Sequence, residues 1–234
     1  MSIRHHPEES LLLAYAGGAT DEATGLIVAV HMAFCAQCRQ TVALMEKIGG
    51  GLLETLPAAP LAQTARDAVL ARLDEAAPAT PRLPPSRDGT PGVLRPYLGG
   101  DLSQVRWRRM GPSLAYKPLF RRGDVSAKLL RGAPGTEVGH HTHRGMEFTL
   151  VLAGGFSDVT GSYAPGDLQV ADAGLRHSPI ADAGEDCINL AVTTAPLKFE
   201  NWVQKIAGPL FGGVPVSGLD VLVHDQQLCR LHIR

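Results

Sequence analysis

Histidine and cysteine residues stand at metal-ligand spacing near the start of the chain. His31, Cys35 and Cys38 form an HxxxCxxC pattern. If a helix continues as far as Cys35, His31 and Cys35 project from the same face, because residues four apart are neighbours on a helix. The CxxC turn then lets both thiolates reach one ion, and ligands of this kind suit Zn²⁺ in a closed tetrahedral site. We therefore expect a structural zinc site here.

The fourth ligand of this site must come from elsewhere, and His5 and His6 are the candidates. The alternative interpretation is a redox-active CxxC pair beside an unrelated histidine, but no thioredoxin-like βαβ pattern surrounds the motif. In a helical module this small, a bound metal would supply part of the folding free energy.

A second set of candidate ligands lies in the C-terminal half. It matches the first cupin motif, G-x5-H-x-H-x3-E-x6-G, at Gly135, His141, His143, Glu147 and Gly154. Residues two apart on a strand face the same way, so His141 and His143 are expected to point into a barrel, with Glu147 at the same parity. By the same rule, His140 should face outward.

A second, more degraded motif runs from Gly166 to His177 and supplies the last ligand. We expect His141, His143, Glu147 and His177 to bind a divalent metal. Nitrogen and oxygen ligands of this kind suit Zn²⁺, Fe²⁺, Mn²⁺ or Ni²⁺, and the spacing does not choose among them. Cys187, on a late strand, either approaches this pocket or simply packs in the core.

These ligands require two kinds of element to position them. Helical signals cover about the first 75 residues: a helix over 10–16, a second opened by Asp21 and Glu22, a third after Cys38 that ends at Gly49-Gly50-Gly51, and a fourth over 61–73. The apolar stripe of the fourth helix, Leu61, Ala65, Val69 and Leu73, could be core or a docking face, and core is favoured.

The period then changes to that of strands. A proline-rich segment, residues 76–92, reads as an interdomain linker. Short β-prone runs follow at 125–130, 146–152, 168–171 and 188–193, separated by turns such as Pro165-Gly166-Asp167. We predict an α + β protein with two domains: a helical module (1–75) and an all-β cupin barrel of the jelly-roll type (93–211), followed by a C-terminal extension (212–234).

Composition restricts the function classes. The net charge is −1, so there is no basic footprint for nucleic acid, and a protein partner is favoured. No apolar run reaches the length of a membrane span, and the N-terminus lacks the order of a signal peptide, so we expect a cytoplasmic protein. In the extension, His224, Cys229 and His232 fit no metal motif that we can justify.

Together these features resemble the zinc-binding anti-sigma factors of the ChrR type, which carry a C-terminal cupin domain. The resemblance is carried by HxxxCxxC, by Ile3-Arg4-His5-His6 with Leu12-Leu13-Ala14-Tyr15-Ala16-Gly17-Gly18, by Asp101–Arg108, and by His143-Arg144-Gly145-Met146-Glu147. It extends over residues 1 to about 211, and it implies that His6 is the fourth zinc ligand.

The resemblance also implies a function. It predicts a cytoplasmic, non-enzymatic regulator whose helical domain inhibits an extracytoplasmic-function (ECF) sigma factor. Its cupin domain, with Zn²⁺ the favoured metal, would be required for release under oxidative signals such as singlet oxygen. The alternative is a metal-dependent cupin dioxygenase with a helical oligomerisation module. Iron in the barrel with turnover of a small diketone or flavonol would favour that alternative.

Overall fold

The computed structural model describes residues 3–73, 75, 84–139, 141–142, 144–195 and 198–199. The predicted C-terminal extension and the first part of the linker, residues 76–83, lie outside the described residues. The same is true of His140 and His143 and of the side chain of His141.

The N-terminal part is helical, as predicted. Its helices are α1 (Glu9–Ala16), α2 (Glu22–Phe34), α3 (Ala36–Glu54) and α4 (Ala65–Ala71). The carboxylate of Asp21 caps α2 by accepting hydrogen bonds from the backbone N–H groups of Ala23 and Thr24. No helix in the described part of the chain is long and apolar enough to cross a membrane.

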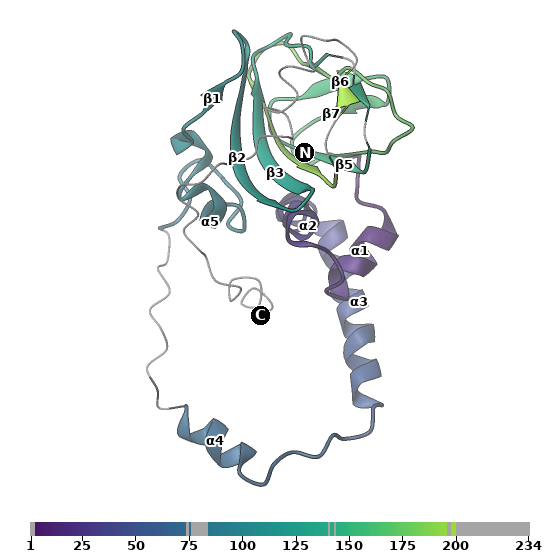
Figure 1. The fold of residues 1–234 in the computed structure, drawn as a ribbon, viewed down its shortest axis with the longest axis vertical. Coiled ribbons are helices and arrows are strands. Elements are labelled where there is room, and N and C mark those ends of the chain that lie inside the picture. The colour runs from purple at the N-terminus through teal and green to yellow at the C-terminus, as the bar shows by residue number, and fades with distance from the viewer. Residues whose placement is uncertain are drawn as a thin grey trace.

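Helix α3 corrects one expectation. The predicted break at Gly49-Gly50-Gly51 is wrong, because the helix continues through all three glycines to Glu54. Each glycine costs about 1 kcal/mol relative to alanine, but it can adopt helical dihedral angles. Extending an existing helix also costs far less than starting one. Figure 1 shows α3 projecting away from the barrel, with α4 beyond its far end.

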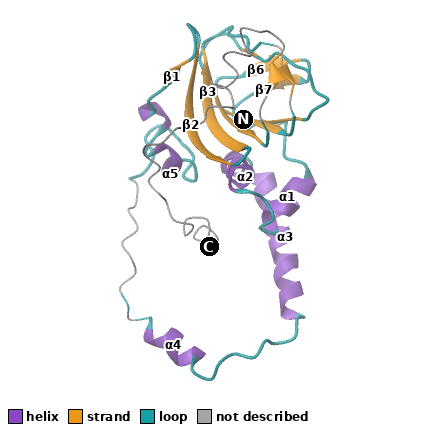
Figure 2. Cartoon of the chain, in the orientation of Figure 1, coloured by secondary structure: helices purple, strands orange, loops and turns teal. Residues whose placement is uncertain are grey.

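The C-terminal part is the predicted barrel of β-strands (Figure 2). A six-stranded antiparallel sheet has the order β1-β2-β3-β10-β5-β8, and smaller sheets pair β11 with β4 and β6 with β7 and β9. The strands are β1 (Arg108–Arg109), β2 (Leu114–Arg122), β3 (Val125–Gly132), β4 (His141–Thr142), β5 (Glu147–Ala153), β6 (Phe156–Asp158), β7 (Gly161–Tyr163), β8 (Leu168–Ala171), β9 (Ile180–Ala181), β10 (Cys187–Thr193) and β11 (Lys198–Phe199). All four predicted β-prone runs are confirmed, as β3, β5, β8 and β10.

The large sheet is covered on its outer face by α2. Side chains alternate along each strand, so one face lines the barrel interior while the other turns outward. Most outward side chains of β3, β5 and β10 are apolar, and α2 packs its own apolar stripe on these strands. One continuous core results, formed by Ala23, Leu26, Ile27 and Val30 of the helix with Ala127, Leu129, Phe148, Leu150, Leu152, Leu168, Leu190 and Val192 of the sheet.

The segment before the barrel also joins this core. Leu94 is fully buried in it, next to the short helices α5 (Arg95–Leu98) and η1 (Leu102–Gln104). The Arg95 guanidinium donates to the Asp101 carboxylate over 2.6 Å in a buried ion pair, and Asp101 also accepts a hydrogen bond from the Arg87 backbone N–H. The end of the predicted linker is therefore held against the fold in residues 87–92.

The shared core predicts that the helices and the barrel unfold together. Ile27 is 0% exposed between α2 and the sheet, so Ile27→Ala should lower the free energy of unfolding of the full chain by about 2–5 kcal/mol. Denaturant unfolding followed by circular dichroism measures this value. Leu53→Ala, at a side chain that is 69% exposed on α3, should change it by less than about 0.5 kcal/mol. A barrel transition left unmoved by Ile27→Ala would contradict the shared core.

Candidate metal centres

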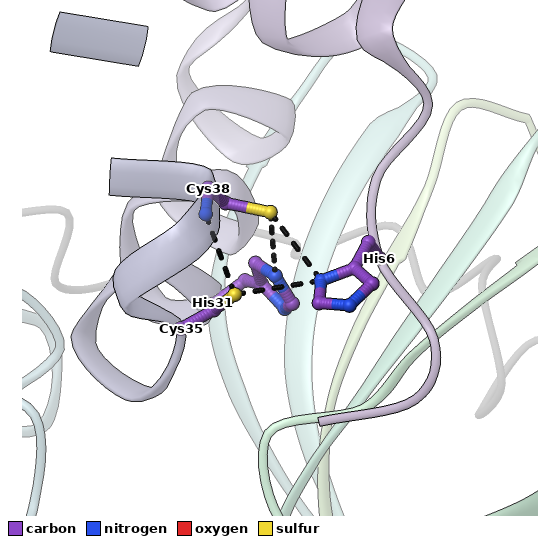
Figure 3. A group of neighbouring side chains, drawn as sticks. All are labelled: His6, His31, Cys35 and Cys38. Carbon is purple, nitrogen blue, oxygen red and sulfur yellow. Dashed lines mark hydrogen bonds between the residues drawn. The ribbon is translucent and has the colours of Figure 1, made fainter. Parts of the chain in front are cut away.

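Four side chains converge where the N-terminal segment meets α2 and α3. The ligand atoms of His6, His31, Cys35 and Cys38 all lie within 4.8 Å of one another (Figure 3). His6 Nδ1 is 3.4 Å from the Sγ atoms of both Cys35 and Cys38, and His31 Nε2 is 3.3 Å from Cys38 Sγ. This is the one group with metal-ligand geometry in the part of the chain that the structure describes.

The junction between α2 and α3 places both cysteines. Cys35 ends α2 and begins α3, with its backbone N–H donating to the carbonyl of His31. Its sulfur accepts from the backbone N–H of Cys38 over 3.4 Å, as a helix-capping side chain does. His31, one turn earlier on α2, therefore faces the same point as both sulfurs, as the HxxxCxxC spacing predicts.

The electrostatics of the cluster favour coordination by a neutral histidine. His31 is completely buried, and burial lowers its pKa to about 4, partly opposed by a hydrogen bond with the Gly166 carbonyl. That bond joins His31 Nδ1 to Gly166 O over 2.8 Å, so Nδ1 carries the proton and Nε2 faces the sulfurs with its lone pair. Burial, together with a hydrogen bond that the Cys38 thiol donates to Cys35, raises the pKa of the Cys38 thiol to about 12.

The donor set fits zinc. A tetrahedron with ordinary Zn–N and Zn–S bond lengths separates nitrogen and sulfur ligands by about 3.5 Å, close to the separations in this cluster. The four residues can therefore hold a metal ion. The structure places His6 in the cluster, whereas the ring of His5 lies 4.3 Å from the ring of Tyr163 in the barrel.

The barrel interior brings together two of the predicted cupin ligands. Glu147 and His177 are buried and line one pocket, with His177 Nε2 3.8 Å from the Glu147 carboxylate. His141 lies on β4 and its side chain is not described, and His143 falls outside the described residues. The full four-residue site in the barrel therefore stays a prediction.

Asp158 is a buried partner of this site that sequence reasoning missed. Its carboxylate contacts His177 Nδ1 over 2.7 Å, which leaves Nε2 directed at Glu147. It is itself held by Gln169 and by the backbone and hydroxyl of Thr160. Burial alone would lower the pKa of His177, but Glu147 and Asp158 together raise it. A carboxylate behind a histidine ligand is a common device for fixing its orientation.

Two further residues line the same pocket. Lys128, also missed from the sequence, buries its side chain inside the barrel, and burial lowers its pKa while the charge of Glu147 opposes the shift. Lys128 stands at an inward-facing position in the alternation of β3, and this alternation in the sequence could have identified it as a residue of the barrel interior. Cys187 lines the pocket as well, so it approaches the predicted metal site and packs in the inner core at the same time.

Comparison with known proteins gives consistent relatives. Residues 98–197 match the family described as ChrR cupin-like domain. The anti-sigma-E factor ChrR of Cereibacter sphaeroides is 40% identical over 213 residues, which is 90% of this chain and 99% of that protein. The anti-sigma ChrR in its crystal complex with SigE, from Rhodobacter sphaeroides, is 38% identical with a TM-score of 0.72. That match covers 82% of this chain and 99% of that one.

The N-terminal cluster predicts a spectroscopic signature. Cobalt(II) added to the full chain should give a thiolate-to-cobalt charge-transfer band, because cysteine sulfur would ligate the ion. Replacing Cys35 and Cys38 together with alanine should abolish the band, because no sulfur ligand then remains in the cluster, and Cys187→Ala, at a buried cysteine outside the cluster, should keep it. Metal uptake should release protons from thiols such as Cys38, so the affinity should rise with pH across the neutral range. A band that survives replacement of both Cys35 and Cys38 would contradict the assignment.

Proposed function

The chain belongs to the ChrR-type family of anti-sigma factors, and from that relationship we propose that it binds and inhibits an ECF sigma factor. The observation that carries the proposal is 40% identity over 99% of the length of a curated anti-sigma factor. The similarity in fold to an anti-sigma chain bound to SigE supports the same partner class.

The surface that would receive the sigma factor is formed by exposed apolar side chains. It consists of exposed large hydrophobic side chains on α3, in the segment that joins α3 to α4, on α4 and directly after it: Leu44, Ile48, Leu52, Leu53, Leu56, Leu61, Val69, Leu70 and Leu73. So long a run of exposed apolar side chains is unusual for a monomer and marks a site of protein interaction.

The same surface decides between the two interpretations of the stripe on the fourth helix. Leu61, Val69 and Leu73 are exposed, so the interpretation as core is wrong for the described chain. In this proposal they are a docking face, and residues 1–75 wedge between two domains of the sigma factor. The chain's net charge of −1 is suited to a protein partner rather than to DNA.

The two metal sites have different roles in this proposal. His6, His31, Cys35 and Cys38 bind Zn²⁺ and hold the helical module in shape. His141, His143, Glu147 and His177 bind a divalent metal, with Zn²⁺ favoured, inside a pocket that senses an oxidative signal such as singlet oxygen. The barrel then acts as a sensor and not as an enzyme, and the protein works in the cytoplasm. Membership of an anti-sigma family supports this division over a cupin dioxygenase.

The docking surface can be tested by introducing one charged side chain into it. Leu53→Asp in the full chain should weaken binding of the sigma factor by about tenfold or more, because a carboxylate would be buried in an apolar contact. Val159→Asp is the matched control, since Val159 is also a strongly exposed apolar side chain, on the turn between β6 and β7. Titration calorimetry measures both affinities. Unchanged binding by Leu53→Asp would exclude this surface.

The sensor role predicts a separation of functions. Glu147→Gln should leave the affinity for the sigma factor unchanged and should abolish its release when an illuminated photosensitiser generates singlet oxygen. Glu185→Gln, at an exposed carboxylate of the barrel, should release the sigma factor normally. The readout is the fraction of sigma factor retained on the immobilised full chain. Normal release from Glu147→Gln would rule out a metal-dependent sensor.

A further inference from the structure

One turn of the barrel contacts the residues that surround the N-terminal metal cluster. This turn, residues 164–167, joins β7 to β8. The Asp167 carboxylate accepts hydrogen bonds from the backbone N–H groups of Arg4, over 2.7 Å, and His5, over 3.0 Å. The backbone N–H of Leu168 donates to the His5 carbonyl over 3.1 Å. Residues 4 and 5 are thereby fixed to the barrel directly before the ligand His6.

The same turn also holds the second histidine of the cluster. The carbonyl of Gly166 accepts the Nδ1 proton of His31, which directs Nε2 towards the sulfurs. Gly166 has φ +93°, and a Cβ there would lie 2.9 Å from Cβ of Phe34 at the end of α2. Only glycine lets the turn approach α2 this closely.

Asp167 is suited to this task by its own environment. It is 2% exposed, and its other carboxylate oxygen accepts the backbone N–H of Ala164. Burial alone would raise its pKa, but the hydrogen bonds from Ala164, His5 and Arg4 outweigh burial and lower it. The buried carboxylate is therefore ionised and fully engaged with the backbone of two segments far apart in the sequence.

We propose that Asp167 is a positioning residue for the N-terminal metal site. It fixes the backbone of residues 4 and 5 so that His6 Nδ1 faces Cys35 and Cys38, while the adjacent Gly166 carbonyl orients His31. The barrel thus orients both histidine ligands of a site whose four ligands all belong to the helical module. This inference rests on the proposed binding of zinc by that module.

The proposal couples the two halves of the chain. If docking of the turn strengthens metal binding, metal binding must strengthen docking by the same factor. Displacement of the turn at residues 164–167 would then loosen the zinc site from outside the helical module.

The experiment measures metal affinity at the cysteine-containing site of the full chain. Cobalt(II) is followed through its thiolate charge-transfer band, which a histidine and glutamate site does not give, and zinc through displacement of the cobalt. Asp167→Ala should weaken the affinity by about ten- to a hundredfold, the usual effect of removing a residue that orients a ligand. Asp172→Ala is the control, because Asp172 likewise accepts two backbone N–H groups in a barrel turn, but these come from Gly174 and Leu175 within the same turn.

A second pair of variants removes the contact from the other side. Arg4→Pro deletes the backbone N–H of residue 4 that donates to Asp167, and it leaves the barrel sequence intact. This variant therefore tests the positioning role of Asp167 even if Asp167→Ala fails to fold. Arg4→Ala keeps the N–H and should bind cobalt as the wild type does, whereas Arg4→Pro should share the weakened affinity of Asp167→Ala.

Each outcome decides one question. Wild-type affinity in both Asp167→Ala and Arg4→Pro, with native circular dichroism, would overturn the positioning role of Asp167. A wild-type chain that gives no thiolate band would instead overturn the proposed zinc site itself. Equal weakening by Asp172→Ala would show a general effect of barrel stability and would also overturn the proposal.

Discussion

The close approach at Gly166 is the constraint on which the rest of the structure depends. At this residue a barrel turn meets both the N-terminal segment and the end of α2, and a side chain would collide with Phe34. The approach lets the Gly166 carbonyl reach His31 and lets Asp167 reach the backbone of Arg4 and His5. The position of the two histidines of the metal cluster relative to the barrel depends on this contact.

The molecule has a clear polarity along its length. In Figure 1 the barrel lies at one end, and α3 and α4 extend away from it. The barrel contains the pocket with Glu147 and His177, the cysteine-containing cluster lies where α2 meets α3, and α3 and α4 carry the exposed apolar side chains. In the proposed function, a signal received in the barrel reaches α3 across this junction. The junction is also where a buried histidine, two thiols and a buried carboxylate meet, so small displacements there change strong interactions.

Local patterns predicted the strands and the grouping of His31, Cys35 and Cys38 well. HxxxCxxC works because a helix and its cap obey short-range rules, and the strand at 168–171 is bounded as predicted. Long-range contacts were invisible to the same rules: Pro165-Gly166-Asp167 read only as a turn, and Asp158 gave no signal. The sequence did contain one indication that a helix covers the sheet. Phe148, Leu150 and Leu152 alternate with inward residues of β5, and apolar residues at these outward positions indicate a sheet that is buried on both faces. The domain boundaries themselves stay a prediction.

The shared core sets a limit on recombination between proteins of this architecture. A proline-rich connection suggests that the helical module and the barrel are independent domains, each of which could be exchanged between proteins. In this chain the apolar stripe of α2, with Leu26, Ile27 and Val30, is matched to the outward side chains of one particular sheet. A chimera that kept the connection but replaced the barrel would place that stripe against a foreign surface. The two halves are therefore expected to be inherited, and to diverge, as one unit.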